Sequence, residues 1–176
     1  GTILVAIVII IAIWETSLDY GREPSIDSGS PGIEEGLFDA SPYSVPGVGN
    51  ELAVHLARLG HDACLWGRDA ALVDDISVRR VNAVYLPDIV LPDGLRVTAA
   101  LDEALEGASL VVAAIPSHGV REVIRRAAPL VRQGQTIISA TKGLEQGTLL
   151  RVSEVLEQEL GARVAVAVLS GPSFAI

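Results

Sequence analysis

Polar residues that could bind an anionic ligand follow several of the apolar runs in this sequence. Lys142 stands in "ATKGLE", and its ammonium group suits an anionic substrate. Arg68 follows the apolar run "DACLW", at a position where an arginine accommodates a 2′-phosphate and an acid favours ribose hydroxyls. In "SGPSFA", Gly171 allows close backbone approach and Ser173 offers a hydroxyl donor. These residue types indicate a site for an anionic ligand.

The segments around these residues alternate between strand and helix patterns from Gly49 to the end. In "NELAVHLARLG" the apolar residues lie along one side of a helix, and Gly60 is a natural stop. Strands are predicted at 62–66, 95–99, 109–116, 136–142 and 163–171, and further helices at 101–108, 119–131 and 149–160. The alternation favours an α/β fold with a doubly wound, Rossmann-type parallel sheet. Ligands of such sheets bind beyond the carboxyl ends of the strands, where the polar residues above should lie.

Composition excludes several classes of partner and site. The chain has 176 residues, enough for one domain, with 13 Lys and Arg against 22 Asp and Glu. Its net charge of −9 gives no general attraction to nucleic acid or to an anionic membrane, so nucleic acid is not an expected partner. The single cysteine, Cys64, excludes a disulfide framework and a cysteine-rich zinc site. It favours a reducing compartment, and we expect a cytoplasmic protein.

The N-terminal segment differs in amino-acid composition from the rest of the chain. Residues 3–14 are continuously apolar, but these 12 residues are short for a membrane-spanning helix, which needs about 20. Their Ile and Val suit a buried strand or an aggregation-prone extension as well as an anchor. Residues 15–44 are rich in Gly, Ser, Pro and acidic residues, a composition typical of loop or disorder. We predict an extension over 1–44 and a domain over 45–176, with the sheet incomplete or aberrant at its N-terminal strand and glycine turn.

Four strand-end motifs carry a family resemblance. "WGRD", "IPSH", "ATKGLE" and "SGPSFA", with "RRVNAVYLPDIVLPDGLRVT", make the chain from about Gly49 to Ala175 resemble the N-terminal domain of the bacterial-type NAD(P)-dependent glycerol-3-phosphate dehydrogenase. The 29 positions from Lys142 to Gly171 fit the family pattern. The resemblance implies that Lys142, Gly171 and Ser173 contact the substrate. It also implies that the cofactor lies against Gly49, Arg68, Pro116, Ser117, Lys142, Ser173 and Ala175.

The resemblance implies a function as well. The family interconverts dihydroxyacetone phosphate and sn-glycerol 3-phosphate for phospholipid synthesis, with NADP or NAD as cofactor. Arg68 favours NADP as the cofactor, whereas the neighbouring Asp69 is compatible with NAD. The lysine that transfers the proton belongs to a later helical substrate domain that this chain lacks, so we expect no catalytic residue here and no activity of the chain as given. The resemblance leaves open whether the full-length enzyme forms a homodimer.

Other polar residues receive no chemical role. His118 is interpreted as a loop residue, and His55 and His61 have no partner pattern for metal or triad chemistry. Asn82 and Tyr85, together with Pro87, are predicted to shape a loop beside the cofactor.

The glycine fingerprint that the family needs before "ELAVHLA" is malformed. The family turn reads G-A-G-S-W-G, and only Gly49 of the aligned residues 44–49 matches it. Pro46 also removes a backbone donor. Codons for residues 41–49, read from the third base, can encode "AVFGAGSW", an apolar strand running into the missing turn. We therefore hypothesise a frameshift close to Gly49, with the segment before it wholly or partly out of frame.

The nucleotide sequence of codons 41 to 50 tests this hypothesis. We expect the shifted frame to encode a glycine-rich turn of the form G-x-G-x-x-G. If it encodes no such turn, the N-terminal segment is a genuine, divergent start of the protein.

Two alternatives to the enzyme remain at this stage. One is a non-catalytic remnant or dinucleotide-binding module, which a stop codon directly downstream would favour over an in-frame helical domain. The other is a dehydrogenase of β-hydroxyacid type, against which "TKGLE" together with "SGPSFA" argues.

Overall fold

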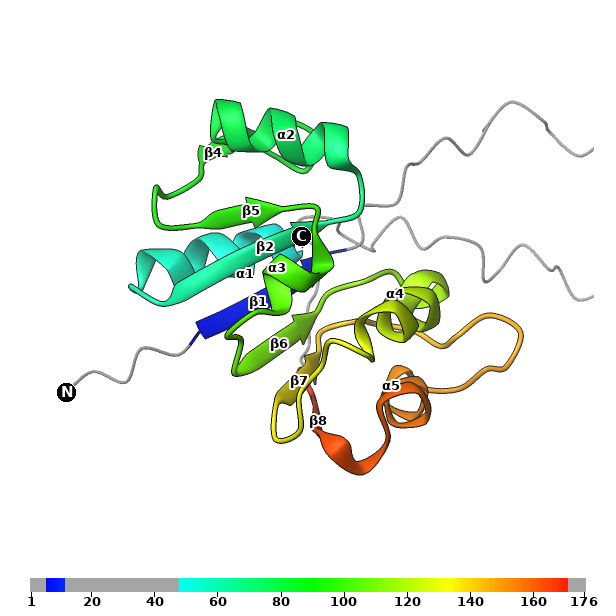
Figure 1. Cartoon of the computed structure of the whole chain (residues 1–176). Coiled ribbons are helices and arrows are strands. Elements are labelled where there is room, and N and C mark those ends of the chain that lie inside the picture. The colour runs from blue at the N-terminus through cyan, green and yellow to red at the C-terminus, as the bar shows by residue number, and fades with distance from the viewer. Residues whose placement is uncertain (1–5, 12–47, 171–176) are drawn as a thin grey trace, which may run out of the picture.

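The computed structural model describes residues 6–11 and 48–170, and its centre is a six-stranded sheet (Figure 1). All neighbouring strands are parallel, in the order β5-β2-β1-β6-β7-β8. Counted along the chain, this is the order third, second, first, fourth, fifth, sixth, which defines a doubly wound sheet. The predicted fold class is confirmed. The strands are β1 (Ala6–Ile11), β2 (Asp62–Gly67), β5 (Arg96–Thr98), β6 (Leu110–Ala113), β7 (Thr136–Ser139) and β8 (Ala165–Val168).

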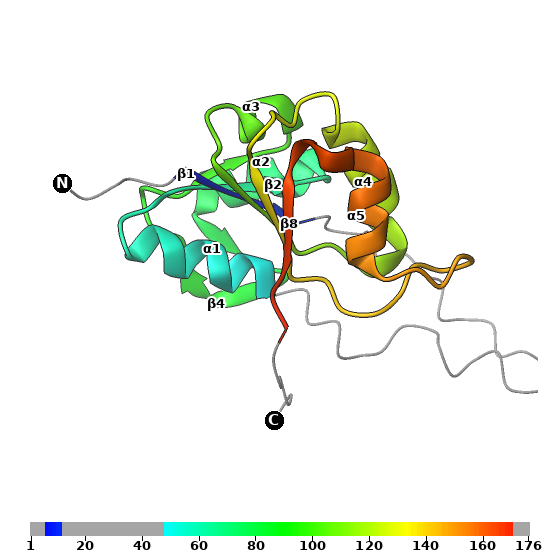
Figure 2. The ribbon, with the colours of Figure 1, turned by 90° about the horizontal axis from the view of Figure 1, so that it is seen from below.

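Helices cover both faces of the sheet, and Figure 2 shows α1 on one side with α4 and α5 on the other. Strand β2 illustrates why, because its successive side chains point to opposite faces. Ala63 and Leu65 pack in a core cluster with α1 and α2, whereas Cys64 and Trp66 pack in a second cluster with α3, α4 and α5. The helices are α1 (Val48–Arg58), α2 (Ala70–Arg79), α3 (Leu101–Leu105), α4 (Val120–Ala127) and α5 (Val152–Leu160).

Local signals fix where the first two helices end and begin. After α1, Gly60 adopts a left-handed φ of 85°, and the His61 amide donates to the Leu56 carbonyl at 3.1 Å. Only glycine adopts this conformation without strain, so it ends the helix and turns the chain into β2. Directly after β2, the Asp69 carboxylate accepts hydrogen bonds from the Ala71 and Leu72 amides and caps α2. This cap leaves Arg68 at the end of the strand.

The structure differs from the sequence prediction in two elements. Helix α2 was not predicted, because only Val73 and Ile76 of its ten residues are buried and its apolar pattern is weak. A short antiparallel hairpin of β3 (Val81–Asn82) and β4 (Leu86–Val90) replaces the predicted loop. Its first strand has only two residues and an irregular register, too little for a period-2 pattern to appear.

Strand β1 occupies the N-terminal strand position at which the sequence analysis expected the sheet to be incomplete or aberrant. Ala6–Ile11, placed by the sequence analysis within an extension over residues 1–44, lies between β2 and β6 at the centre of the sheet. Residues 6–11 of the apolar run therefore form a strand within a sheet covered on both faces, which is the first of the three interpretations given above. No helix within residues 6–11 and 48–170 is long and apolar enough to cross a membrane.

Proline at position 9 tests the place of β1 in the fold. Ile9 pairs with Leu65 of β2 and with Val112 of β6. Because proline lacks the amide donor that a central strand needs, Ile9→Pro should lower the free energy of unfolding by about 2 kcal/mol or more in urea titrations. The control Ile9→Val keeps the donor and should cost about 1 kcal/mol or less. Equal stability of Ile9→Pro and the parent chain would remove β1 from the sheet.

Candidate functional site

The carboxyl ends of the parallel strands gather the predicted site residues at one edge of the sheet. Arg68 directly follows β2, and Pro116 and Ser117 stand between β6 and α4. Lys142 follows β7, and the buried Gly49 lies in the first turn of α1. The three remaining predicted contacts, Gly171, Ser173 and Ala175, lie outside the described residues.

Two contacts join the loop after β6 to the loop after β7. The Ile115 amide donates to the Thr141 hydroxyl at 3.2 Å, and that hydroxyl donates to the Ala113 carbonyl, also at 3.2 Å. Gly143 has a φ of 92°, and a Cβ placed on it would lie 3.4 Å from the Ser117 hydroxyl oxygen. A side chain here would be strained and would crowd Ser117, so glycine is required where the two loops meet.

Lys142 lies between these two contacts and is exposed. None of the ion pairs within the described part of the chain involves its ammonium group. The structure therefore places an exposed lysine directly before Gly143, which meets Ser117, at the edge where ligands of doubly wound sheets bind.

Arg68 and Asp69 have different structural environments. Arg68 reaches across the edge to α4 and pairs with Glu122 at 3.5 Å, with both side chains well exposed. Such an exposed pair contributes little stability. The Asp69 carboxylate is already bound to the first turn of α2.

The β3–β4 hairpin is tied to the first turn of α1. Asn82 donates to the Asn50 side-chain oxygen at 3.0 Å, and both residues are fully buried. The Asn82 oxygen accepts from the Tyr85 amide at 3.1 Å. The hairpin thus lies beside the start of α1, where the sequence analysis expected Asn82 and Tyr85 to shape the surroundings of the cofactor.

Sequence reasoning gave no role to a buried ionic network behind the loop after β7. Arg121 of α4 donates to both carboxylate oxygens of Glu145, at 2.6 and 2.8 Å, and to Glu159 of α5 at 2.7 Å. Thr148 donates a further hydrogen bond to Glu145. Glu145 belongs to the quoted motif "ATKGLE", but its partner stands 24 positions earlier on another element. No local sequence pattern predicts the pairing of Glu145 with Arg121.

This network makes stability depend on acid pH. Hydrogen bonds from Arg121, and then from Thr148, lower the pKa of Glu145 from 4.5 to about 2. Glu159 also has a lowered pKa, owing first to Arg125 and also to Arg121. Because folding lowers these pKa values, their stabilisation is complete above the ordinary pKa and is lost as pH falls through the folded-state value.

We therefore expect Glu145→Gln to remove part of the acid dependence of stability. The parent chain should lose unfolding free energy between pH 4.5 and about 2, and the variant should lose less over the same range. Urea titrations at stepped pH measure both slopes. Parallel slopes would show that Glu145 has the same pKa in the folded and unfolded states.

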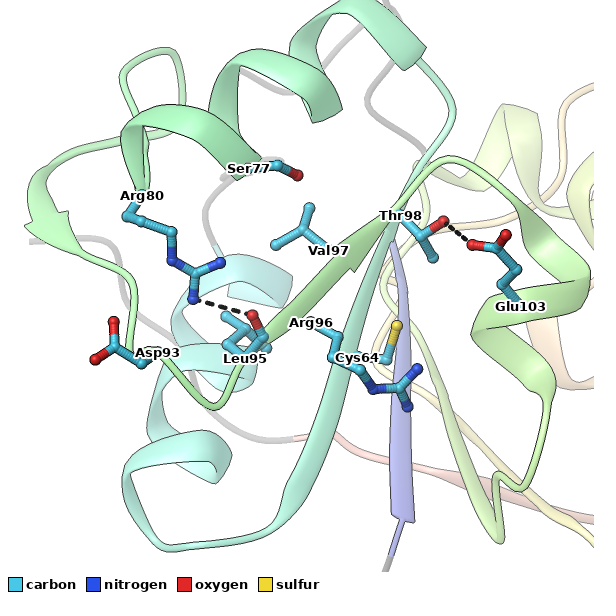
Figure 3. Close-up of a pocket in the computed structure, with 9 residues that line it drawn as sticks. All are labelled: Cys64, Ser77, Arg80, Asp93, Leu95, Arg96, Val97, Thr98 and Glu103. Carbon is cyan, nitrogen blue, oxygen red and sulfur yellow. Dashed lines mark hydrogen bonds between the residues drawn. The ribbon is translucent and has the colours of Figure 1, made fainter.

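A separate cavity of about 410 Å³ runs along the outer edge of β5 (Figure 3). Two of its polar side chains have partners within the lining: Arg80 donates to the Leu95 carbonyl at 3.0 Å, and Thr98 to Glu103 at 3.0 Å. The Cys64 thiol on its wall is buried, and burial raises its pKa, which makes it a poor nucleophile. This cavity is apart from Ser117 and Lys142, and we do not assign the site to it.

The strand order and the polar carboxyl edge together define the class of this protein. In doubly wound sheets of this order, ligands bind where the strand order reverses, here between β1 and β6. The first turn of α1 and the loop that carries Ser117 border that point. The chain is a doubly wound domain of the nucleotide-binding type.

Comparison with known families identifies the domain more closely. The family model described as the NAD-dependent glycerol-3-phosphate dehydrogenase N-terminus matches residues 47–176. The chain belongs to this family, which confirms the resemblance found in the sequence.

Curated relatives and solved structures agree with this assignment. Glycerol-3-phosphate dehydrogenases [NAD(P)+] of Stenotrophomonas maltophilia and Xanthomonas euvesicatoria are 48% identical over 127 residues, 72% of this chain. The chain spans 37% of the length of these relatives. A crystal structure of glycerol-3-phosphate dehydrogenase from Coxiella burnetii matches 97% of this chain and 42% of its own, with a TM-score of 0.71 and 30% identity. A yeast glycerol-3-phosphate dehydrogenase, 18% identical with a TM-score of 0.66, shares the fold.

Proposed function

We propose that this chain is the cofactor-binding part of an NAD(P)H-dependent enzyme that interconverts dihydroxyacetone phosphate and sn-glycerol 3-phosphate for glycerophospholipid synthesis. The match of residues 47–176 to the dehydrogenase family carries the proposal. The contact between Gly143 and Ser117 at the carboxyl edge supports it, because the exposed Lys142 directly precedes Gly143 and this edge therefore offers a cation and a hydroxyl to a phosphorylated substrate.

The residues at this edge fit a dinucleotide. Gly49 lies in the first turn of α1, and we propose that backbone amides of this turn bind the pyrophosphate. Arg68 would hold a 2′-phosphate if the cofactor is NADP, and Pro116 and Ser117 would border the ring system. Gly171, Ser173 and Ala175 are proposed to complete the cofactor and substrate contacts, as the resemblance implies.

Arg68, Pro116 and Ser117 would hold the nicotinamide cofactor, which would supply the hydride that the substrate's carbonyl carbon accepts. Lys142 contributes a positive charge that binds and orients the phosphorylated substrate. The oxygen that becomes a hydroxyl takes its proton from a lysine of the helical domain, which we propose to follow this chain in the full-length enzyme. This division of labour assigns binding to the present chain and proton transfer to the next domain.

A completed chain tests the proposal. We define the completed chain as residues 49–176 with two additions from the Stenotrophomonas maltophilia dehydrogenase. The first strand and glycine turn of that enzyme precede residue 49, and its C-terminal part follows residue 176. We expect the completed chain to oxidise NADPH or NADH in the presence of dihydroxyacetone phosphate, and not with dihydroxyacetone, which lacks the phosphate. The chain as given should show no turnover.

Two results would contradict the proposal. A completed chain that folds and binds NADPH but does not reduce dihydroxyacetone phosphate would refute the substrate. Turnover by the chain as given would refute the need for a second domain.

A non-catalytic dinucleotide-binding remnant is the second candidate, favoured by the malformed glycine turn at residues 44–49. The coding sequence after residue 176 separates the two, since an in-frame helical domain supports the enzyme. We further propose that the full-length enzyme is cytoplasmic. We also propose that it forms a homodimer, and sedimentation of the completed chain would test this oligomeric state.

A further inference from the structure

Glu145 is the only buried charged residue in the part of the chain that the structure describes. Its side chain is 11% exposed, and its two oxygens face Arg121, whose side chain is 23% exposed. Burying a carboxylate costs free energy unless it is paired and hydrogen-bonded, and here a bidentate arginine provides the pairing. Arg121 lies on α4 and Glu145 in the segment between β7 and α5, so the pair joins that loop to the helix.

The loop folds back on itself around Glu145. The Glu145 amide donates to the Leu150 carbonyl at 2.9 Å, and the Leu149 amide donates to the Glu145 carbonyl at 2.9 Å. An isolated antiparallel bridge joins Leu144 and Arg151 at the neck of this loop. Glu145 is therefore the point where the whole loop is fixed to α4.

Lys142 is held from both sides by these contacts. On one side, Thr141 is bound to the end of β6 through Ala113 and Ile115. On the other side, Gly143 turns the chain against Ser117, and two residues later Glu145 is fastened to Arg121. Releasing Glu145 would leave only the turn at Gly143 to hold Lys142 on that side.

We propose that Arg121 and Glu145 are positioning residues that hold Lys142 at the substrate edge of the sheet. The inference rests on the proposed function of Lys142 as a substrate-binding cation. Glu159 of α5 supports the arrangement, since it accepts from the other side of Arg121 at 2.7 Å and keeps the guanidinium aimed at the loop. Neither positioning residue needs to touch the substrate.

Arg125 offers a matched control. It stands one turn after Arg121 on α4 and donates to Glu159 at 2.9 and 3.1 Å, so it joins the same two helices. Its hydrogen bonds and its ion pair in the described part of the chain go to Glu159 and not to residues 140–151, and its side chain is 64% exposed. Arg125→Gln therefore weakens the contact between α4 and α5 without releasing the loop.

The first experiment observes Lys142 directly in the chain as given. Lys142 is the only lysine of the sequence, so reductive methylation with isotope-labelled formaldehyde yields one lysine signal beside that of the N-terminal amine. We expect Glu145→Gln and Arg121→Gln to move and sharpen this NMR signal toward that of free dimethyl-lysine. Arg125→Gln should leave it in place. An unchanged signal in Glu145→Gln would overturn the proposal, as would an equal change in all three variants.

The second experiment measures catalysis in the completed chain. Glu145→Gln should lower kcat/KM for dihydroxyacetone phosphate about tenfold or more while the NADPH Kd changes little, and Arg125→Gln should stay within about twofold of the parent. In the Lys142→Ala background, Glu145→Gln should cause no further loss, because the residue acts through Lys142. Additive losses would show a role independent of Lys142 and would overturn the proposal.

The two experiments separate the inference from the function on which it rests. A completed chain without any dehydrogenase activity refutes the proposed function, and the NMR comparison still decides whether Arg121 and Glu145 hold Lys142. An active completed chain whose Glu145→Gln variant retains the parent kcat/KM refutes the positioning role alone.

Discussion

Replacing Lys142 with alanine in the completed chain should lower kcat/KM for dihydroxyacetone phosphate by about 100-fold or more, a loss typical of a deleted positioning or electrostatic group. The ammonium group is exposed at the carboxyl edge of the sheet, and no carboxylate of the described residues pairs with it. Its charge is therefore free to bind the phosphorylated substrate. Steady-state kinetics with varied substrate concentration measure the effect.

Arg132→Ala provides the control for Lys142→Ala. It also removes one exposed cation, but Arg132 precedes β7 and so lies at the opposite edge of the sheet. We expect its kcat/KM to remain close to that of the parent. If Lys142→Ala retained near-parent activity, Lys142 would be a solvated lysine in a turn without a role in substrate binding.

Arg68→Asp in the completed chain should weaken NADPH binding far more than NADH binding. The change removes a charge-assisted bond to the 2′-phosphate and adds repulsion, an effect on the order of 2 kcal/mol or more, about 30-fold in Kd. NADH lacks the 2′-phosphate, so its Kd should change little. Fluorescence titration with each cofactor measures the difference.

The ion pair with Glu122 sharpens this prediction. Glu122 competes for the Arg68 guanidinium at 3.5 Å, so Glu122→Gln should strengthen NADPH binding modestly and leave NADH unchanged. Equal changes in both Kd values for Arg68→Asp would remove Arg68 from a 2′-phosphate site and leave it as an exposed ion pair.

Local pattern predicted most of the regular elements and failed where a pattern was short or weak. The apolar run of β6 stands out because it is buried almost throughout, and α4 because its buried residues recur at helical spacing. Helix α2 buries only Val73 and Ile76, and β3 has two residues, so neither gave a usable signal. Four of the five predicted strands were longer than the observed ones, and the strand at 62–66 was one residue shorter than β2, since side-chain pattern does not show where backbone pairing stops.

The candidate site was predictable in part for a geometric reason. Once strands and helices alternate, a parallel sheet follows, and the residues after each strand must share an edge. Sequence reasoning could therefore name Arg68, Ser117 and Lys142 without coordinates. It could not show that Gly143 meets Ser117, because that contact depends on how two loops pack.

By itself, the sequence determined the doubly wound class, the family and the polar residues at the strand ends, because each follows from periodicity or from motifs within a few residues. The tertiary structure alone decided that Ala6–Ile11 is the central strand and that Arg121 holds Glu145. Both depend on partners far away in the sequence, β2 and β6 for the strand and α4 for the carboxylate. Such pairings arise only when the chain closes on itself, and no local preference encodes them.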